Sequence, residues 1–503
     1  NFMEETKMRR RSSGVLMHIT SLPGKQGIGT FGKSAYDFVD FLEETQQTYW
    51  QLLPLTTTSY GDSPYQSFSA VAGNLNLIDF DLLEEEGLLE KVDYEGVNFG
   101  DNPEKVDYGL LFDVRRPILE KAVANVVKSD KVLAEIEKFE KENASWLVDY
   151  AEYMAIKESF GYQSFIHWDE DIKRAEISAR EKYRIELQDS IRYYTITQYF
   201  FFKQWLALKN YANSKGIKII GDMPIYVSAD SVEMWTMPEL FKVNEDNEPL
   251  YVAGCPADDF SPTGQLWGNP IYNWEKHREQ NYSWWVYRVQ ESFKMYDVLR
   301  IDHFKGFSDY WQIDSNAETA AIGTWEAGPG IELFEKIKAE LGDLPIIAEN
   351  LGFIDAKAEK LLEDSTYPGM KILQFAFPGE DNLDRPHHYT QNSVAYTGTH
   401  DNDVVNGWYA ELDEKGKEFV DTYLNRRDGE KITEAMIRGI YSSVSDYAIV
   451  TMQDLLDKDT TSRMNIPSTV GGNWEWRMLE EDLTSERKEF LKNITKLYAR
   501  ERG

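Results

Sequence analysis

The feature that most constrains the fold is a rhythm of short apolar runs, each bounded by polar or turn-forming sequence. Runs of this length suit buried parallel strands, and helical patterns, for example at 34–45 and 199–214, separate most neighbouring pairs. Strand–helix–strand order implies parallel pairing, so eight such runs predict an α/β protein, a (β/α)8 TIM barrel. The predicted strands are 14–19, 49–55, 217–220, 298–304, 344–348, 370–377, 393–398 and 447–452.

Residues 82–198 interrupt this rhythm after the second strand. The segment is acidic and mostly helical in period, which predicts a large helical insertion subdomain with solvated charged faces. Residues 1–81 and 199–503 would then form the catalytic barrel. Two stretches rich in glycine, proline and aromatic residues, 57–73 and 225–274, are predicted to be long active-site loops at the C-terminal face of the barrel.

The charge of the chain limits its partners. It carries 54 basic and 86 acidic side chains, a net charge of −32, which would repel nucleic acid and an anionic membrane surface. A neutral substrate is therefore expected. No apolar run approaches the length of a membrane span, and we expect a cytoplasmic protein that is a monomer or weak homodimer.

Cofactor chemistry is not indicated by the sequence. The only cysteine, Cys255, excludes an intrachain disulfide and a thiolate metal cluster. The spacing of the seven histidines suggests no zinc site. We therefore predict no metal and no organic cofactor.

Carboxylates follow several of the predicted strands. In a (β/α)8 barrel the active groups lie at the carboxyl ends of the strands, so these side chains should share one rim. Several carboxylates in one small site cannot all ionise with ordinary pKa values, so their acidities should differ. The carboxylates are Asp222, Asp302, Glu349, Asp401 and Asp454.

Asp302 and Glu349 are predicted to have different protonation states. Arg300 lies two residues before Asp302 on the same strand face, and a nearby cation favours an ionised carboxylate. Glu349 follows an apolar strand with no cation adjacent in sequence, so burial should raise its pKa and keep it protonated. One ionised and one protonated carboxylate are the equipment for breaking a glycosidic bond, and retaining enzymes hold the pair about 5–5.5 Å apart.

Two other interpretations of these residues stay open. Arg300 and Asp302 could form a structural ion pair, and the carboxylates could bind Mg²⁺. A magnesium-dependent phosphotransferase is less favoured, because the chain has no glycine-rich phosphate loop of the Walker type.

A series of motifs runs nearly from one end of the chain to the other, among them YGDSPYQS, GDMPIY, RIDHF, AENLG and TGTHD. In this order and number they resemble the 4-α-glucanotransferases called amylomaltases, or disproportionating enzymes, of the α-amylase clan. The motifs lie at 60–67, 221–226, 264–272, 300–304, 348–352, 397–401, 465–467 and 473–474.

The resemblance assigns roles to the residues at the rim. It implies that Asp302 is the nucleophile, that Glu349 is the acid/base, and that Asp401 is a third carboxylate that helps to hold the sugar distorted. Arg300 and His400 would bind near the cleaved sugar.

Further substrate-binding residues are predicted less directly. Asp222 matches the first strand-end aspartate of the clan, although it could instead cap the segment that follows. Tyr60 and Trp267 could stack on sugar rings or only pack their loops, and Asn473, in the last motif, is also expected to contact substrate. Asn350 is a departure, because the family commonly has aspartate after the acid/base.

The implied reaction is transfer of α-1,4-glucan segments between maltooligosaccharides, by double displacement through a covalent intermediate on Asp302. A hydrolase of α-glucans with the same carboxylates is the alternative within enzymes. A catalytically silent glycan-binding protein is the alternative from another class.

Overall fold

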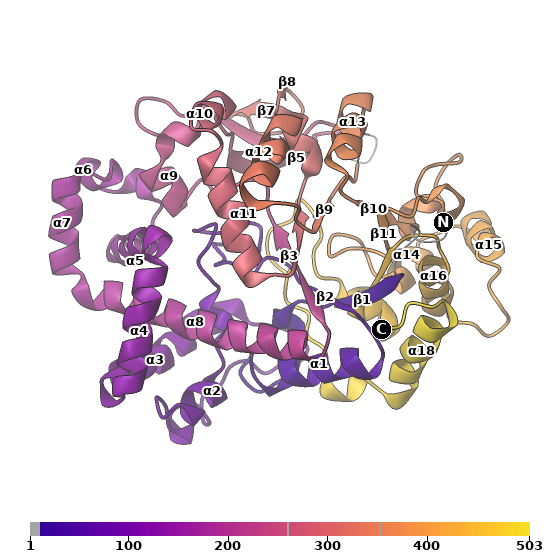
Figure 1. Cartoon of the computed structure of the whole chain (residues 1–503), viewed down its shortest axis with the longest axis horizontal. Coiled ribbons are helices and arrows are strands. Elements are labelled where there is room, and N and C mark those ends of the chain that lie inside the picture. Colours follow the sequence, from indigo (N-terminus) through magenta and orange to yellow (C-terminus); the bar gives the residue numbers. More distant parts are fainter. Residues whose placement is uncertain (1–10, 259–260, 353) are drawn as a thin grey trace, which may run out of the picture.

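The computed structural model describes residues 11–258, 261–352 and 354–503 (Figure 1), so residues 259–260 of the predicted loop 225–274 lie outside the described residues. Eight parallel strands close into a barrel in the order β1-β12-β11-β10-β9-β6-β3-β2, which confirms the (β/α)8 architecture. The barrel strands are β1 (Ser12–Leu16), β2 (Tyr49–Gln51), β3 (Lys218–Met223), β6 (Val298–Ile301), β9 (Ile346–Ala348), β10 (Gly369–Ile372), β11 (Ser393–Tyr396) and β12 (Tyr447–Thr451).

Several strands are shorter than the apolar runs that predicted them. The run 370–377 continues β10 into a 3₁₀ helix, η8 (Leu373–Ala376), so the second half of that strand prediction was wrong. Strand β6 ends at Ile301, and His303 turns the chain with a φ of +49°. An apolar run indicates burial, and a buried turn at the rim of the barrel has the same pattern as a buried strand.

The register between strands sets the height of the side chains at the rim. Ile301 at the end of β6 pairs with Ala348 at the end of β9. Asp302 and Glu349 are the next residues, so they leave neighbouring strands at the same level. Because adjacent strands lie about 4.8 Å apart, the two backbones are side by side at this point.

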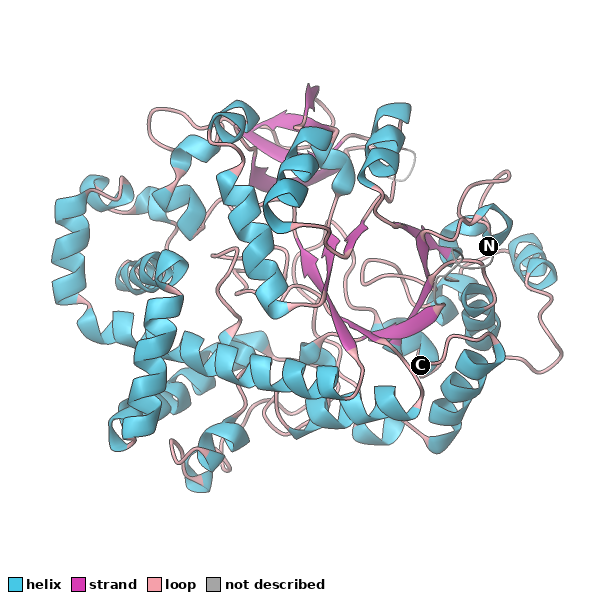
Figure 2. Cartoon of the chain, in the orientation of Figure 1, coloured by secondary structure: helices cyan, strands magenta, loops and turns pink. Residues whose placement is uncertain are grey.

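Helices cover the outside of the barrel, while the strands form its centre (Figure 2). The predicted helix 34–45 is present as α1 (Lys33–Glu44), which buries Phe38, Phe41 and Leu42 on one face. The helices after β3 are α9 (Val232–Thr236), α10 (Trp274–Glu279), α11 (Ser283–Met295), α12 (Ile331–Leu341), α13 (Ala356–Ser365), α14 (Val405–Ala410), α15 (Glu414–Tyr423), α16 (Ile432–Tyr441), α17 (Met452–Leu455) and α18 (Ser485–Leu497).

The segment between β2 and β3 is largely helical. Its last helix, α8 (Gln188–Ser214), has 27 residues, so the predicted helix 199–214 is only its second half and the predicted start was wrong. The first half is rich in Tyr and Thr, which favour strands, and this composition hid the helix. The helices before it are α2 (Phe80–Glu85), α3 (Tyr108–Asn125), α4 (Asp130–Glu142), α5 (Ala144–Ser159), α6 (Glu170–Lys173) and α7 (Ile177–Glu186).

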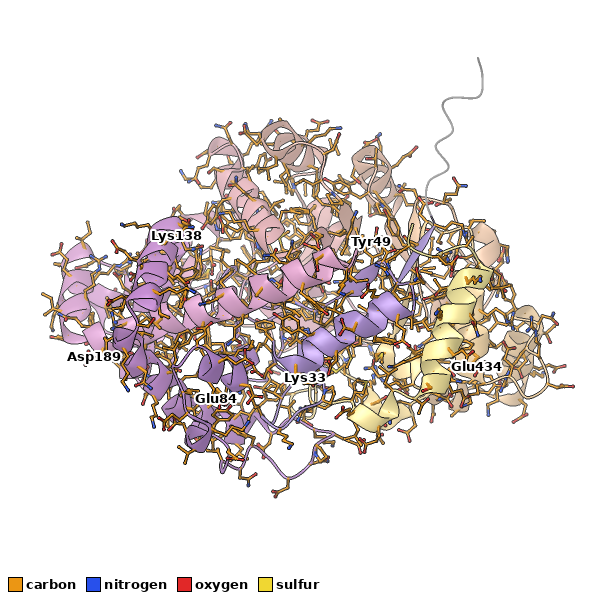
Figure 3. All side chains as sticks on the ribbon, turned by 60° about the horizontal axis from the view of Figure 1, so that its bottom comes forward. Lys33, Tyr49, Glu84, Lys138, Asp189 and Glu434 are labelled. Carbon is orange, nitrogen blue, oxygen red and sulfur yellow. The ribbon has the colours of Figure 1, made fainter. Side chains whose placement is uncertain are left out.

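Helix α8 joins this segment to the barrel. It packs against α1, and the two helices run side by side in Figure 3, where Asp189 marks the first turn of α8 and Lys33 the first turn of α1. The proposed boundary between 198 and 199 falls inside α8. The division into a barrel and an insertion subdomain stays a prediction.

The predicted loop 225–274 contains regular structure, so its interpretation as irregular throughout was wrong. It includes α9 (Val232–Thr236), and it supplies two strands of a separate four-stranded antiparallel sheet, whose other strands come after β6. The two strands from this loop are joined to the two later strands by the pairing of β4 with β7, which are distant in sequence, so no local pattern predicts the four-stranded sheet. The sheet, in the order β5-β4-β7-β8, comprises β4 (Tyr251–Cys255), β5 (Gln265–Pro270), β7 (Asp309–Asp314) and β8 (Thr324–Ala327).

Within the described ranges, none of the helices has the length and apolar character that crossing a membrane requires.

Candidate active site

A buried arginine stands at the centre of the acidic rim. Arg300 on β6 pairs in register with Asp222 on β3, and its Nη1 lies 2.8 Å from Asp222 Oδ1 and 3.2 Å from Asp302 Oδ1. Both Arg300 and Asp222 are buried. A buried cation is costly unless it is paired, and here two carboxylates pair with it. The predicted Arg300–Asp302 pair therefore exists and extends to Asp222.

Asp302 sits where β6 ends. Its backbone N–H donates to the carbonyl of Met223 at 3.0 Å, and its side chain keeps 27% of its surface exposed, which leaves the carboxylate accessible. Burial raises the pKa of Asp302 to about 7, although Arg300 acts in the opposite direction. The expectation that Arg300 keeps the pKa of Asp302 low was wrong, because the loss of water outweighs one neighbouring cation.

Glu349 is fixed beside Asp302 by the backbone. Its Oε2 accepts the N–H of His303 at 2.8 Å, and its Oε1 accepts the N–H of Leu351 at 2.6 Å. Burial raises the pKa of Glu349, as predicted, while the two backbone donors and Arg300 act to lower it. The charge of Glu349 is one cause of the raised pKa of Asp302, so the protonation of Asp302 is linked to that of Glu349.

Asp401 is more acidic than Asp302 and Glu349. Its Oδ2 lies 3.3 Å from His400 Nε2, and its Oδ1 accepts a hydrogen bond from Asn465 Nδ2 at 2.7 Å. Burial alone would raise the pKa of Asp401, but His400 and Asn465 together bring it down to about 2. The same ion pair raises the pKa of His400 against the effect of its burial. Asp401 is therefore ionised, and 48% of its side-chain surface is exposed.

Tyr65 contacts both Asp222 on β3 and His400 after β11. It was not among the site residues predicted from the sequence. Its hydroxyl donates to Asp222 Oδ2 at 2.5 Å, and its ring stacks on His400 with centroids 5.0 Å apart. Trp474 lies 5.9 Å from both rings. Tyr65 stands within the motif 60–67, which was the available signal.

Asn465 is a second residue of the candidate site that was not predicted from the sequence. It stands in the motif 465–467, but nothing local shows that its amide reaches Asp401, 64 residues away in the chain. Asn350, the departure from the family pattern, has a structural contact: its Oδ1 accepts the N–H of Met370 at the start of β10.

Trp267 and Tyr60 are the predicted stacking residues. The ring of Trp267 on β5 meets the ring of His303 edge-on, with centroids 4.9 Å apart. His303 is the residue that follows Asp302 in the chain. Tyr60 is 95% exposed at the tip of the loop 57–73, so its ring does not pack that loop. Stacking of either ring on a sugar stays a prediction.

Asn473 and Asp454 have structural contacts. Asn473 accepts the N–H of Ile466 and donates to Thr469 Oγ1 at 2.9 Å, which holds its own loop together, so substrate contact by Asn473 stays a prediction. Asp454 is buried in α17, directly after β12, where it accepts hydrogen bonds from Thr397 Oγ1 and from the N–H of Val405.

The fold and the acidic rim define the class of protein: a (β/α)8-barrel enzyme with its active site at the carboxyl ends of the strands. The profile of a family described as 4-alpha-glucanotransferase matches residues 17–483. The chain belongs to the 4-α-glucanotransferase family, which confirms the resemblance to amylomaltases.

Individual relatives agree with this assignment. A 4-alpha-glucanotransferase of Streptococcus pneumoniae (strain TIGR4) is 55% identical over 496 residues, which cover 98% of each chain. One from Clostridium butyricum is 49% identical and covers 96% of this chain and 100% of its own. The structure of an amylomaltase from Streptococcus agalactiae in complex with acarbose is 59% identical, with a TM-score of 0.96 over 98% of this chain and 100% of that one.

Proposed function

We propose that the enzyme transfers segments of α-1,4-glucan between maltooligosaccharides with retention of configuration, by double displacement. Asp302 attacks the anomeric carbon while Glu349 protonates the departing glycosidic oxygen. The glucanyl ester on Asp302 is then attacked by the 4-hydroxyl of an acceptor glucan, whose proton passes to Glu349. The ester bond breaks, Asp302 is restored as a carboxylate, and Glu349 is again protonated.

The register of β6 and β9 is the observation that carries this proposal: it pairs Ile301 with Ala348, so that Asp302 and Glu349, the next residues, leave neighbouring strands at the same level. Neighbouring strands about 4.8 Å apart suit the carboxyl separation of about 5–5.5 Å that a retaining mechanism uses. An inverting enzyme needs about 6.5–9.5 Å between the two groups, to leave room for water. Adjacent strands in register therefore favour retention.

The position of Arg300 supports the two proposed roles. Arg300 contacts Asp302 directly at 3.2 Å, whereas it acts on Glu349 from a greater distance, without an ion-pair contact. Where two carboxyls with raised pKa values share one proton, the cation favours the negative charge on Asp302 and leaves the proton on Glu349. Asp302 then serves as nucleophile and Glu349 as acid.

Asp401 is proposed to bind hydroxyl groups of the sugar whose bond is cleaved. With its pKa near 2 it is a permanent acceptor, and Asn465 and His400 hold it in place. Hydrogen bonds from a sugar to such a carboxylate strengthen as positive charge develops on the ring, which lowers the barrier. The family resemblance supports the same role.

The substrate class follows from charge and from relatives. A net charge of −32 suits a neutral polymer, and the amylomaltase from Streptococcus agalactiae was crystallised with acarbose. Tyr60 and Trp267 are proposed to stack on glucose units, which would hold an acceptor in the cleft and exclude water. A hydrolase with the same carboxylates is the alternative function. Cytoplasmic location and the monomeric or weakly dimeric state stay predictions.

Maltotriose separates transfer from hydrolysis. Transfer yields glucose together with a ladder of longer oligomers, whereas a hydrolase yields shorter products alone. The variant Asp302→Asn should abolish turnover and keep the affinity for glucan within about tenfold, or roughly 1.4 kcal/mol. Exposed Asp428 offers a matched control, since Asp428→Asn should leave turnover unchanged. Retained activity in Asp302→Asn would refute the nucleophile.

A further inference from the structure

Three exposed side chains converge on the loop between β10 and β11, and none of them is among the catalytic residues proposed above. Asp381, His387 and His388 each place one ligand-type atom within 4.8 Å of the others. Asp381 Oδ1 lies 3.0 Å from His387 Nε2, and its Oδ2 lies 2.6 Å from His388 Nε2. Both histidines stand at the end of the 3₁₀ helix η9 (Pro386–His388), with ring centroids 4.3 Å apart.

A fourth residue orients one of these rings. The other ring nitrogen of His387, Nδ1, lies 2.8 Å from the hydroxyl of Tyr423 at the end of α15. Histidines that ligate metals almost always use their second ring nitrogen in this way, as a donor to a fixed oxygen. The contact therefore holds His387 with Nε2 directed at the carboxylate of Asp381.

We propose that Asp381, His387 and His388 bind a divalent transition-metal ion, with Zn²⁺ the best fit to two imidazole nitrogens and one carboxylate oxygen. Zinc takes four ligands at about 2.0–2.2 Å in a tetrahedron, so its ligand atoms stand about 3.3 Å apart. The present separations need only small movements of exposed side chains. Water would take the fourth position.

Metal binding moves protons within the two imidazole rings and forms or breaks no other covalent bond of the protein. Each neutral imidazole that now presents Nε2–H to Asp381 must carry its proton on Nδ1 instead, so that Nε2 can bind the ion. For His387, the hydroxyl of Tyr423 can accept from Nδ1–H.

One cation faces the cluster and must be weighed against it. Nη1 of Arg385 lies 3.6 Å from Asp381 Oδ1. The guanidinium is held mainly by the backbone, through Nε to the carbonyl of Ala376 at 2.8 Å and Nη2 to that of Gly379 at 3.3 Å. It therefore keeps its place when a metal takes the carboxylate. Its charge favours a strongly coordinating ion such as Zn²⁺ over Mg²⁺ or Ca²⁺, which depend on charge and on oxygen ligands.

The histidine spacing gave no sign of this site, because adjacent histidines in a loop do not form a familiar zinc motif. The consequence of binding would be structural. The ion would join the arm of the loop that carries Asp381 to η9 and, through Tyr423, to α15. We expect Zn²⁺ to raise the melting temperature of the protein and to leave glucan transfer unchanged.

The test is titration of the untagged, EDTA-dialysed full chain with Zn²⁺ by calorimetry, at a pH where histidine is neutral. Wild type should take up one equivalent at this site. His388→Ala and Asp381→Asn each remove a ligand and should weaken that uptake about 100-fold or more, while Tyr423→Phe should weaken it about 10-fold, as expected for a residue that orients a ligand. His167→Ala, at another exposed histidine, is the matched control and should bind as wild type does.

A cobalt titration gives a second readout. Tetrahedral Co²⁺ bound by two imidazoles absorbs visible light, and the band should appear in wild type and His167→Ala and be absent from His388→Ala. The proposal is overturned if wild type takes up no Zn²⁺ at the highest concentration that keeps it in solution. It is equally overturned if His388→Ala and Asp381→Asn bind Zn²⁺ as wild type does, which would place the ion elsewhere, for example on the catalytic carboxylates.

Discussion

Glu233 provides a quantitative test of how burial acts in this protein. It lies in α9, is buried, and accepts the N–H of Ala70 through Oε1 at 2.7 Å. Ala70 belongs to the loop 57–73, which also carries Tyr65. The other oxygen, Oε2, is buried and has no hydrogen-bond partner among the described residues. Burial raises the pKa of Glu233 to about 7, although Ala70 and Arg288 act to lower it.

The sign of the effect on stability follows from this shift. The pKa of Glu233 is higher in the folded state than the value of 4.5 expected in the unfolded state. Its contribution is therefore fully present below pH 4.5 and is lost as the pH rises through about 7. With these two pKa values, folding loses about 2 kcal/mol between about pH 5.5 and pH 8, at about 1.36 kcal/mol per unit.

Glu233→Gln should remove this loss, because a neutral amide keeps the acceptor for Ala70 and never ionises. Unfolding entropy of about 2.1 cal/mol/K per residue gives about 1 kcal/mol/K for 503 residues, so 2 kcal/mol corresponds to about 2 °C in melting temperature. The difference between variant and wild type should therefore grow by about 2 °C from pH 5.5 to pH 8. The lower pH stays above the sequence pI of about 4.7, to limit aggregation.

Differential scanning calorimetry at matched protein concentration and scan rate would measure this difference. Exposed Glu239, six residues further on, is the control, and Glu239→Gln should show no such trend. A difference that is the same at both pH values, or that grows in the opposite direction, would refute the reasoning. It would mean that Glu233 stays ionised in the folded protein, with a partner for Oε2 that burial alone does not reveal.

Three further predictions concern the catalytic rim. Glu349→Gln should stop turnover of maltotriose but still release fluoride from α-glucosyl fluoride, whose leaving group needs little protonation. Rapid mixing would detect a burst of fluoride, and the absence of that burst would argue against an acid role for Glu349. Tyr65→Phe should lower kcat/KM about 10- to 100-fold, since a hydrogen bond to a charged group is worth about 1.5–3 kcal/mol; steady-state kinetics equal to wild type would remove Tyr65 from the site. EDTA should leave transfer on maltotriose unchanged, because carboxylates alone perform the proposed steps; a loss of activity restored by Mg²⁺ would instead favour the metal-binding interpretation of the rim.

The sequence by itself determined the barrel and most of the candidate site. A short apolar run between polar segments is most readily buried as a strand, and its alternation with helices is compatible with few topologies. All eight barrel strands were therefore predicted, although some of their bounds were not. Carboxylates that follow those runs must then meet at one rim. The motifs identified the family because each one is a short local sequence, and their order along the chain can be read without the structure.

Only the tertiary structure decided what depends on distant neighbours. Tyr65 reaches Asp222 across 157 positions and Asn465 reaches Asp401 across 64, and no local pattern encodes either contact. The pKa of Asp302 is raised, although Arg300, two residues earlier, had suggested a lowered value, because the packed barrel removes water from the carboxylate. The cluster of Asp381 with two histidines likewise depends on how one loop folds back on itself. Burial, the conformation of a loop and contacts between remote segments arise only when the chain folds, which is why these features could not be predicted from neighbouring residues.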